Sequence, residues 1–244
     1  MKLHISQTMD SLSHDIAEWL VADIQKTLDK QDRYTISLSG GNTPKGLYTL
    51  LAEAPYRDQI DWGKIHIFFG DERYVPFDDD RNNGKMAYET LLRHVPIPEN
   101  QIHYFNTTFS PEESAGEYSK ILHNYFDSKP HTFDLVLLGM GDDGHTLSLF
   151  PGTAVIHENK KWVTAYFVEK LNMYRITLTV PVVVQSNAVA FLAAGDKKAV
   201  TLKEVIEGGY NPDKYPSQII KPLNNNLHWF IDKAAAAQLE TTNK

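Results

Sequence analysis

The sequence contains no cysteine among its 244 residues. This absence excludes a disulfide framework, a thiolate zinc site, an iron–sulfur cluster and a cysteine nucleophile, so any nucleophile must be an oxygen or a nitrogen atom. The longest apolar runs, at 180–184 and 188–194, are far shorter than the ~20 residues that cross a bilayer. The first ten residues lack the apolar core of a secretory signal. We therefore expect a soluble, cytoplasmic protein with no membrane partner.

The chain also lacks an excess of basic residues, since 24 Lys and Arg stand against 31 Asp and Glu and the formal charge is −7. Nonspecific binding to nucleic acid requires many cations, so we expect no nucleic-acid partner. Internal repeats, low-complexity segments and Pro/Ser-rich linkers are missing as well. With 42% hydrophobic and 23% charged residues, the composition predicts one globular domain over residues 1–244.

Apolar runs alternate with amphipathic segments along most of the chain. The spacing of apolar residues predicts helices at 10–30, 44–51, 85–93, 111–126 and 196–206. Short apolar runs predict strands at 34–38, 65–69, 133–138, 162–168, 175–179, 188–194 and 227–231. The alternation predicts an α/β fold, an open three-layer sandwich with a mostly parallel, Rossmann-like sheet and helices on both faces. In such sheets, ligands bind beyond the carboxyl ends of the strands.

A glycine pair follows the first of these strands, in the segment SGGNTP at residues 39–44. Glycines let the backbone approach an anion closely, and a helix that begins near Pro44 would point free N–H groups at it. A plain strand-to-helix turn has the same composition, so the glycines alone do not decide. The spacing matches neither a P-loop nor a dinucleotide-binding fingerprint, so neither ATP nor NAD is predicted.

Charged residues follow the next strand, in the segment GDERYVP at residues 70–76. Two carboxylates and a guanidinium directly after a buried strand are costly to desolvate unless they are paired or used in chemistry. An ion pair at the rim of the sheet and a functional site both remain open for Asp71, Glu72 and Arg73.

The most apolar strand leads into a glycine-rich segment at residues 139–152, in which His145 lies two residues after Asp143. Imidazole can take and return a proton near neutral pH, and an adjacent aspartate can orient it. We therefore expect acid–base chemistry at His145. One histidine with nearby aspartates does not have the multi-histidine spacing of zinc sites, so we expect no metal.

Two further cations stand at predicted strand ends, Arg175 at the start of one strand and Lys198 just after another. In an acidic protein, fixed cations at strand ends can concentrate a negatively charged substrate. Solvated surface cations would look the same in the sequence.

Taken together, these four segments resemble the 6-phosphogluconolactonase family, within the wider group that includes glucosamine-6-phosphate deaminase/isomerase. The string DGHTLSLFPG at residues 143–152 is the most specific part of the resemblance, whereas SGGNTP and GDER are shared more widely. The resemblance implies hydrolysis of 6-phospho-D-glucono-1,5-lactone to 6-phosphogluconate without a cofactor, the second step of the oxidative pentose phosphate pathway. The expected partner is this small-molecule sugar phosphate lactone, and the expected assembly is a monomer or a small homo-oligomer.

The same resemblance implies roles for individual residues. The residues that hold the phosphate would be Gly40, Gly41, Asn42, Thr43, Arg175 and Lys198. His145 would be the general base, and Asp71 and Arg73 would line the lactone site. We add the hypotheses that Asp143 or Asp71 orients His145 and that Arg73 stabilises the oxyanion. The departures from the family pattern are Leu147 for alanine, Asn82-Asn83 for Ser-Asn, and Asn42 for serine.

Two other functions are weighed against lactone hydrolysis. The related deaminases carry a glutamate just before the proline that closes the histidine loop, whereas this chain has Phe150, whose ring cannot shuttle a proton. A noncatalytic sugar-phosphate sensor, like the effector domains of some transcription regulators, usually adds a DNA-binding helix pair, and the first thirty residues predict only one helix. Ammonia release from glucosamine 6-phosphate would favour the deaminase, and ligand binding without turnover would favour the sensor.

Overall fold

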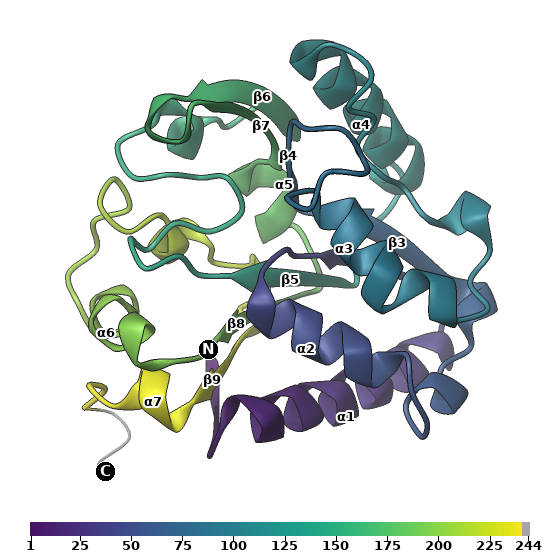
Figure 1. The fold of residues 1–244 in the computed structure, drawn as a ribbon, viewed down its shortest axis with the longest axis horizontal. Coiled ribbons are helices and arrows are strands. Elements are labelled where there is room, and N and C mark those ends of the chain that lie inside the picture. Colours follow the sequence, from purple (N-terminus) through teal and green to yellow (C-terminus); the bar gives the residue numbers. More distant parts are fainter. Residues whose placement is uncertain (241–244) are drawn as a thin grey trace.

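The structure, a computed structural model, describes residues 1–240 (Figure 1). The strands are β1 (Lys2–Ser6), β2 (Tyr34–Leu38), β3 (Ile65–Phe69), β4 (Asp71–Arg73), β5 (Leu135–Gly139), β6 (Val163–Val168), β7 (Met173–Leu178), β8 (Ala188–Ala193) and β9 (Leu227–Asp232). The helices are α1 (Met9–Leu28), α2 (Asn42–Leu51), α3 (Asn83–Thr90), α4 (Pro111–Phe126), α5 (Val180–Val184), α6 (Ala199–Ile206) and α7 (Lys233–Ala236). The last four residues of the predicted domain lie outside the described part.

A six-stranded parallel sheet forms the centre of the molecule, in the order β1-β9-β8-β5-β2-β3. Helices α1 and α2 lie below this sheet in Figure 1, and α4 and α5 lie above it. The arrangement confirms the predicted three-layer α/β fold with a mostly parallel sheet. None of the helices in residues 1–240 has both the length and the hydrophobicity of a membrane span.

Local sequence explains the central elements. Helix α1 begins at a capping box in which Thr8 and Ser11 satisfy each other's backbone N–H groups. Its apolar residues recur at helical spacing, and Leu12, Ile16 and Leu20 are buried. Strand β5 is apolar along its whole length because both faces of the sheet are covered, and Leu135 to Leu138 are 0% exposed.

Two predicted strands, at 162–168 and 175–179, do not join the central sheet. They form β6 and β7 of a second, antiparallel sheet with the order β4-β7-β6. The connection between them is too short for a parallel crossover, which needs a dozen or more residues. The third strand, β4, comprises charged residues of the segment at 70–76, for which the sequence predicted no strand. The prediction also missed β1, α5 and α7, which are short.

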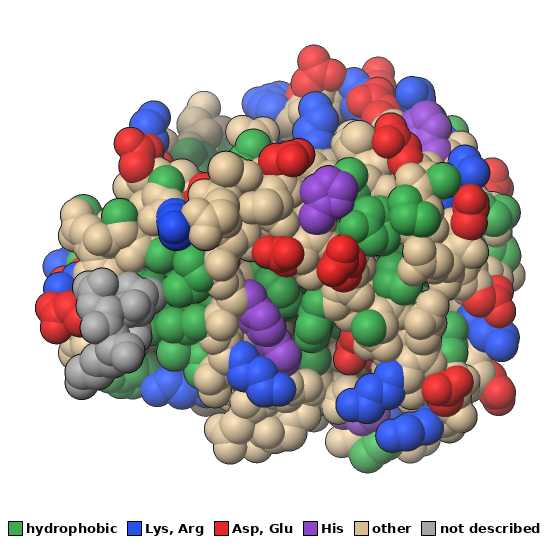
Figure 2. All heavy atoms as spheres, turned by 90° about the horizontal axis from the view of Figure 1, so that it is seen from below, with side chains coloured by type: hydrophobic (Ala, Val, Ile, Leu, Met, Phe, Trp, Pro, Cys, Tyr) green, Lys and Arg blue, Asp and Glu red, His purple; other side chains and the backbone are tan. Residues whose placement is uncertain are grey.

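The face seen from below Figure 1 is shown in Figure 2, with lysine, arginine and acidic side chains interspersed among hydrophobic and histidine side chains. Helix α1 lies on this side of the sheet. The exposed charged residues of α1 itself are Asp10, Asp15, Glu18 and Lys26, so acidic side chains outnumber basic ones on this helix.

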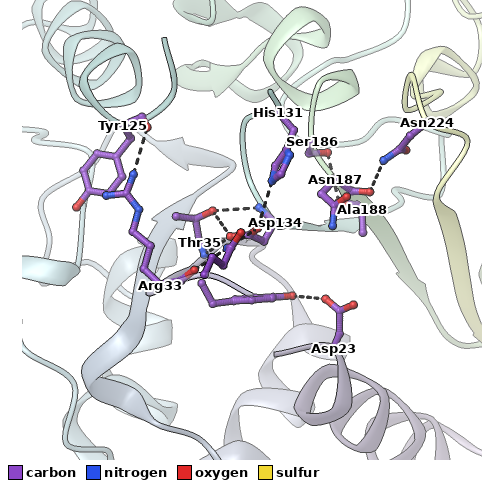
Figure 3. A network of polar contacts seen from close by, with 12 residues as sticks. Asp23, Arg33, Thr35, Tyr125, His131, Asp134, Ser186, Asn187, Ala188 and Asn224 are labelled. Atoms are coloured by element: carbon purple, nitrogen blue, oxygen red, sulfur yellow. Dashed lines mark hydrogen bonds and ion pairs between the residues drawn. The ribbon is translucent and has the colours of Figure 1, made fainter. Parts of the chain in front are cut away.

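At the amino edge of the central sheet, the carboxylate of Asp134 joins β5 to β2 (Figure 3). Its Oδ2 accepts hydrogen bonds from the backbone N–H and the hydroxyl of Thr35, both at 2.8 Å. Its Oδ1 accepts one from Gln31 Nε2 at 3.0 Å and lies 3.3 Å from His131 Nε2. Burial by itself would raise the pKa of Asp134, but the hydrogen bonds from His131, Thr35 and Gln31 outweigh it and lower that pKa.

Candidate active site

The loops singled out in the sequence meet at the opposite, carboxyl edge of the sheet. Strands β2 and β3 end in register, as do β5 and β8, so the loops that follow these strands emerge side by side. Two glycines mark where the loops touch: a Cβ at Gly40 would lie 2.0 Å from Asn83 Oδ1, and one at Gly70 would lie 2.6 Å from Leu147 Cδ2. Side chains of α3 and of the histidine loop thus fill the space that these glycines leave. The edge between β2 and β5 is where open α/β sheets bind ligands.

His145 forms the centre of the third loop. Its Nδ1 lies 2.5 Å from Asp143 Oδ1, and its ring packs on Phe150 with a centroid distance of 4.4 Å. Since a carboxylate only accepts hydrogen bonds, the Nδ1 must carry the proton, and in the neutral imidazole Nε2 is then an acceptor. Among residues 1–240, no group hydrogen-bonds to this Nε2. The open question of which carboxylate contacts His145 is therefore answered in favour of Asp143.

Asp143 is held as an anion. The hydrogen bond from His145 contributes most to lowering the pKa of Asp143 far below its ordinary value; burial opposes this, and the hydrogen bond from Lys170 adds to it. Lys170 Nζ lies 2.5 Å from Asp143 Oδ2, so the two carboxylate oxygens serve different partners. The sequence analysis did not single out Lys170, because this residue lies in the turn between β6 and β7, far from the histidine loop along the chain.

Asp71 lies in the second loop and contacts a different set of groups. Its Oδ2 accepts a hydrogen bond from Ser148 Oγ at 2.6 Å and lies 3.8 Å from Arg175 Nη1. Ser148 belongs to the DGHTLSLFPG string, but the sequence analysis assigned it no role. These contacts tie the second loop to the histidine loop and to β7.

Arg73 and Arg175 stand opposite each other in the β4–β7 ladder. The Nη1 of Arg73 donates to the carbonyl of Arg81 at 2.5 Å. The Nε of Arg73 and the Nε of Arg175 are buried, and within residues 1–240 neither has a hydrogen-bond partner. Buried N–H groups are rarely left unpaired, so the two arginines are unusual in this respect. Burial lowers the pKa of Arg175; Asp71 opposes this shift and Arg73 adds to it.

Glu72, whose role the sequence left open, is structural. Neighbouring residues of a strand point to opposite faces, so Glu72 turns away from Asp71 and Arg73. Its carboxylate accepts backbone N–H groups of Asn83 at 2.7 Å and Gly84 at 2.9 Å, at the start of α3. Burial raises the pKa of Glu72 to about 7, although the backbone hydrogen bonds oppose that rise. The side chain of Asn83 in turn donates to the carbonyl of Asp71 at 2.9 Å.

The predicted phosphate-binding residues fall into two groups. Gly41 is the N-cap of α2 with φ +108°, and no side chain of residues 1–240 caps the helix, so Asn42 and Thr43 form an uncapped first turn. Helix α2 thus begins two residues earlier than predicted. Lys198 instead forms an ion pair with Asp142 of the histidine loop, with Nζ and Oδ1 2.5 Å apart. No group of three or more His, Asp or Glu side chains in residues 1–240 is arranged to hold a metal ion.

Comparison with known proteins adds to this geometry. The family model described as glucosamine-6-phosphate isomerases/6-phosphogluconolactonase matches residues 7–229. A 6-phosphogluconolactonase of Synechocystis is 40% identical over 220 residues, which are 88% of this chain and 89% of that protein. The solved 6-phosphogluconolactonase of Trypanosoma brucei is 28% identical with a TM-score of 0.85, and the match covers 98% of both chains.

A second solved structure with the same fold is that of a deaminase. A monomeric glucosamine-6-phosphate deaminase has a TM-score of 0.84 at 19% identity, over 98% of this chain and 100% of that one. At this identity the likeness concerns the fold alone. The architecture therefore does not distinguish lactone hydrolysis from deamination, and the side chains of the loops have to decide.

Proposed function

The chain belongs to the glucosamine-6-phosphate isomerase/6-phosphogluconolactonase family, and from this premise we propose that it hydrolyses 6-phospho-D-glucono-1,5-lactone to 6-phosphogluconate. It is then a carboxylic ester hydrolase, a 6-phosphogluconolactonase. One observation carries the proposed chemistry: the imidazole of His145 is fixed through Nδ1 by Asp143, while its Nε2 has no partner among the described residues.

In the proposed reaction, His145 Nε2 takes a proton from a water molecule whose oxygen attacks the lactone carbonyl carbon. The tetrahedral intermediate then collapses, the bond between that carbon and the ring oxygen breaks, and the ring oxygen receives a proton. The carboxylic acid formed releases a proton to the medium. General base catalysis of this kind is worth typically ~10²–10⁴-fold in rate.

Two further groups complete the proposal. Arg73, a half-buried residue whose Nε has no partner among the described residues, stabilises the oxyanion, and Arg175 adds positive charge beside Asp71. The uncapped first turn of α2, with Gly40, Gly41, Asn42 and Thr43, binds the phosphate together with Arg175 and Lys198. Binding the phosphate away from the reacting carbon orients the lactone relative to His145. The reaction would belong to the oxidative pentose phosphate pathway in the cytoplasm.

Deamination of glucosamine 6-phosphate is the less favoured activity. The side chain before the proline that closes the histidine loop is Phe150, which packs on His145. A phenyl ring has no proton to transfer, whereas ring opening and isomerisation of an amino sugar require proton transfers between several atoms.

The decisive experiment is a pH-stat assay on freshly generated 6-phospho-D-glucono-1,5-lactone. We expect proton release to be much faster than the spontaneous hydrolysis measured without protein. Ammonia release from glucosamine 6-phosphate is assayed in parallel and is expected to stay at background. Lactone hydrolysis at the spontaneous rate, or release of ammonia, would refute the proposal.

A further inference from the structure

The turn between β6 and β7 places a lysine over the histidine loop. Lys170 Nζ lies 2.5 Å from Asp143 Oδ2, on the oxygen that His145 does not use. We propose that Lys170 is a positioning residue, which locks the carboxylate of Asp143 in the orientation that holds His145 for catalysis. The proposal rests on the proposed function, in which His145 is the general base.

The two contacts of Asp143 differ in what they fix. Asp143 Oδ1 accepts hydrogen bonds from the ring Nδ1 of His145 at 2.5 Å and from its backbone N–H at 3.2 Å. The terminal torsion of an aspartate is broad and roughly two-fold, so contacts to this one oxygen leave the plane of the carboxylate poorly defined. A second partner on the other oxygen restricts that torsion, because both oxygens now have to stay in place. Lys170 supplies this partner from an element that is distant in sequence, and a carboxylate that cannot rotate keeps the imidazole in one tautomer and one orientation.

Phe150 holds Lys170 on a second side. The Nζ of Lys170 lies 4.6 Å from the centre of the Phe150 ring, a distance at which a cation is attracted to the aromatic face. The ring of His145 packs on the same phenyl ring. Lys170, Asp143, His145 and Phe150 thus form a closed set of four contacts, with the turn of β6 and β7 as its outer support.

The exposure of Lys170 separates positioning from folding. Its side chain is 51% exposed, so the ion pair with Asp143 is well solvated and contributes little to overall stability. The removal of the charge is therefore expected to change catalysis without unfolding the protein. By contrast, the buried Arg175 contacts Asp71 and also lies within 5.8 Å of the Phe150 ring, so its substitution would disturb several loops at once.

The charges around the imidazole give the proposal a pH signature. His145 faces Asp143 directly and Lys170 through that carboxylate, while Arg175 lies beyond Phe150. Lys198 and Asp142 of the neighbouring segments are paired with each other. Removing Lys170 takes one cation from this set, which makes protonation of His145 easier. The acid limb of the pH–rate profile then moves to higher pH.

The test compares K170M, which keeps the length of the side chain but not its charge, with K170R and with L171A as a control in the same turn. For K170M we expect kcat to fall about tenfold, with KM within about twofold and the acid limb shifted upward by about 0.5 pH unit. K170R restores most of kcat, and L171A, whose side chain is 40% exposed, behaves like the unmodified protein. Thermal melting checks that each variant is folded.

Two results would overturn the proposal. A K170M variant with unchanged kcat and a raised KM would mean that Lys170 binds substrate instead of positioning Asp143. A K170M variant whose kcat and pH profile match those of L171A would mean that Lys170 has no role in the reaction.

A measurement that needs no turnover separates this proposal from the proposed function. The ¹⁵N chemical shifts of the His145 ring, followed against pH, report the tautomer and the titration midpoint directly. We expect K170M to raise that midpoint and to mix the tautomers, and unchanged shifts would refute the role of Lys170. If the unmodified protein fails to hydrolyse the lactone, the proposed function fails while the ring shifts still test Lys170.

Discussion

The molecule carries two histidine–aspartate pairs at opposite ends of the same strand. His131 and Asp134 lie just before β5 at the amino edge of the sheet, and Asp143 and His145 lie just after it at the carboxyl edge. The imidazoles are almost equally accessible, with side-chain exposures of 32% for His131 and 30% for His145. Exposure of the histidine therefore does not tell the two pairs apart.

The carboxylates do differ. The side chain of Asp134 is 4% exposed, and its oxygens accept hydrogen bonds from Thr35, Gln31 and His131. The side chain of Asp143 is 38% exposed, and in the described part of the chain its oxygens accept hydrogen bonds only from His145 and Lys170. At the amino edge, a carboxylate organises the backbone of two strands. At the carboxyl edge, a carboxylate organises an imidazole.

The surroundings of the two histidine–aspartate pairs differ as well. The amino-edge pair lines a hollow of about 500 Å³, a size that small ligands often fill. Yet the nearby Arg33 is engaged with the carbonyl and the ring of Tyr125. At the carboxyl edge, the Nε groups of Arg73 and Arg175 have no hydrogen-bond partner within residues 1–240. Unused donors and an unused imidazole nitrogen, rather than a hollow, mark the site where we expect chemistry.

The largest effect should come from removing one histidine of each pair. H145A is expected to lower kcat for lactone hydrolysis by about 10²–10⁴-fold, because the general base is lost, while KM stays within about threefold. H131A removes only one long hydrogen bond to Asp134, so we expect its kcat to stay within about twofold. Both are measured by pH-stat on fresh lactone.

Two outcomes would contradict the expected difference between H145A and H131A. If H145A also abolished binding of 6-phosphogluconate, His145 would be a structural residue of the loop. If H131A lowered kcat as strongly as H145A, the amino edge would take part in the reaction, and the contrast between the edges would be lost.

The aspartates give the next largest effect. D143N keeps the shape of the side chain but replaces an acceptor with a donor next to His145 Nδ1, so the ring favours the wrong tautomer. We expect kcat to fall by about 10²-fold, less than for H145A, and the free energy of unfolding to change by less than about 0.5 kcal/mol. An activity of D143N equal to that of the unmodified protein would show that Asp143 does not orient the general base.

The sequence predicted the strands of the central sheet except β1, because a strand buried on both faces has a distinctive composition, as in β5, whereas β1 is an edge strand that is largely not buried. It also named Asp143 as one of two candidate partners of His145, and the contact between these two residues, which are close along the chain, is present in the structure. It could not find Lys170 or the partner of Asp71, because those contacts join segments that only the folded chain brings together. Strand β4 was missed because its charged residues are typical of a loop, and only their pairing with β7 explains their burial.

Substitution of Asp134 should lower stability more than activity, the reverse of what we expect for Asp143. D134N places an amide group against the donors of Thr35 and Gln31, so at least one buried hydrogen bond is lost and donors face each other. We expect the free energy of unfolding to fall by about 2 kcal/mol, with kcat of the folded protein within about twofold. Urea unfolding followed by tryptophan fluorescence measures the first quantity, and D143N is the matched control.

The smallest effect is the pH dependence of the stability that D134N loses. The pKa of Asp134 is lowered in the folded protein, so its stabilising contribution is complete above the unfolded value of about 3.9 and disappears as pH falls through the folded value. A protonated Asp134 resembles asparagine, having one donor and fewer acceptor sites. The difference in unfolding free energy between the unmodified protein and D134N should therefore stay constant from pH 7 to pH 5. Below pH 4 this difference should shrink by about 1 kcal/mol. A gap that stayed constant down to pH 3 would mean that the charge of Asp134 does not stabilise the fold, and that its place between the strands depends on shape alone.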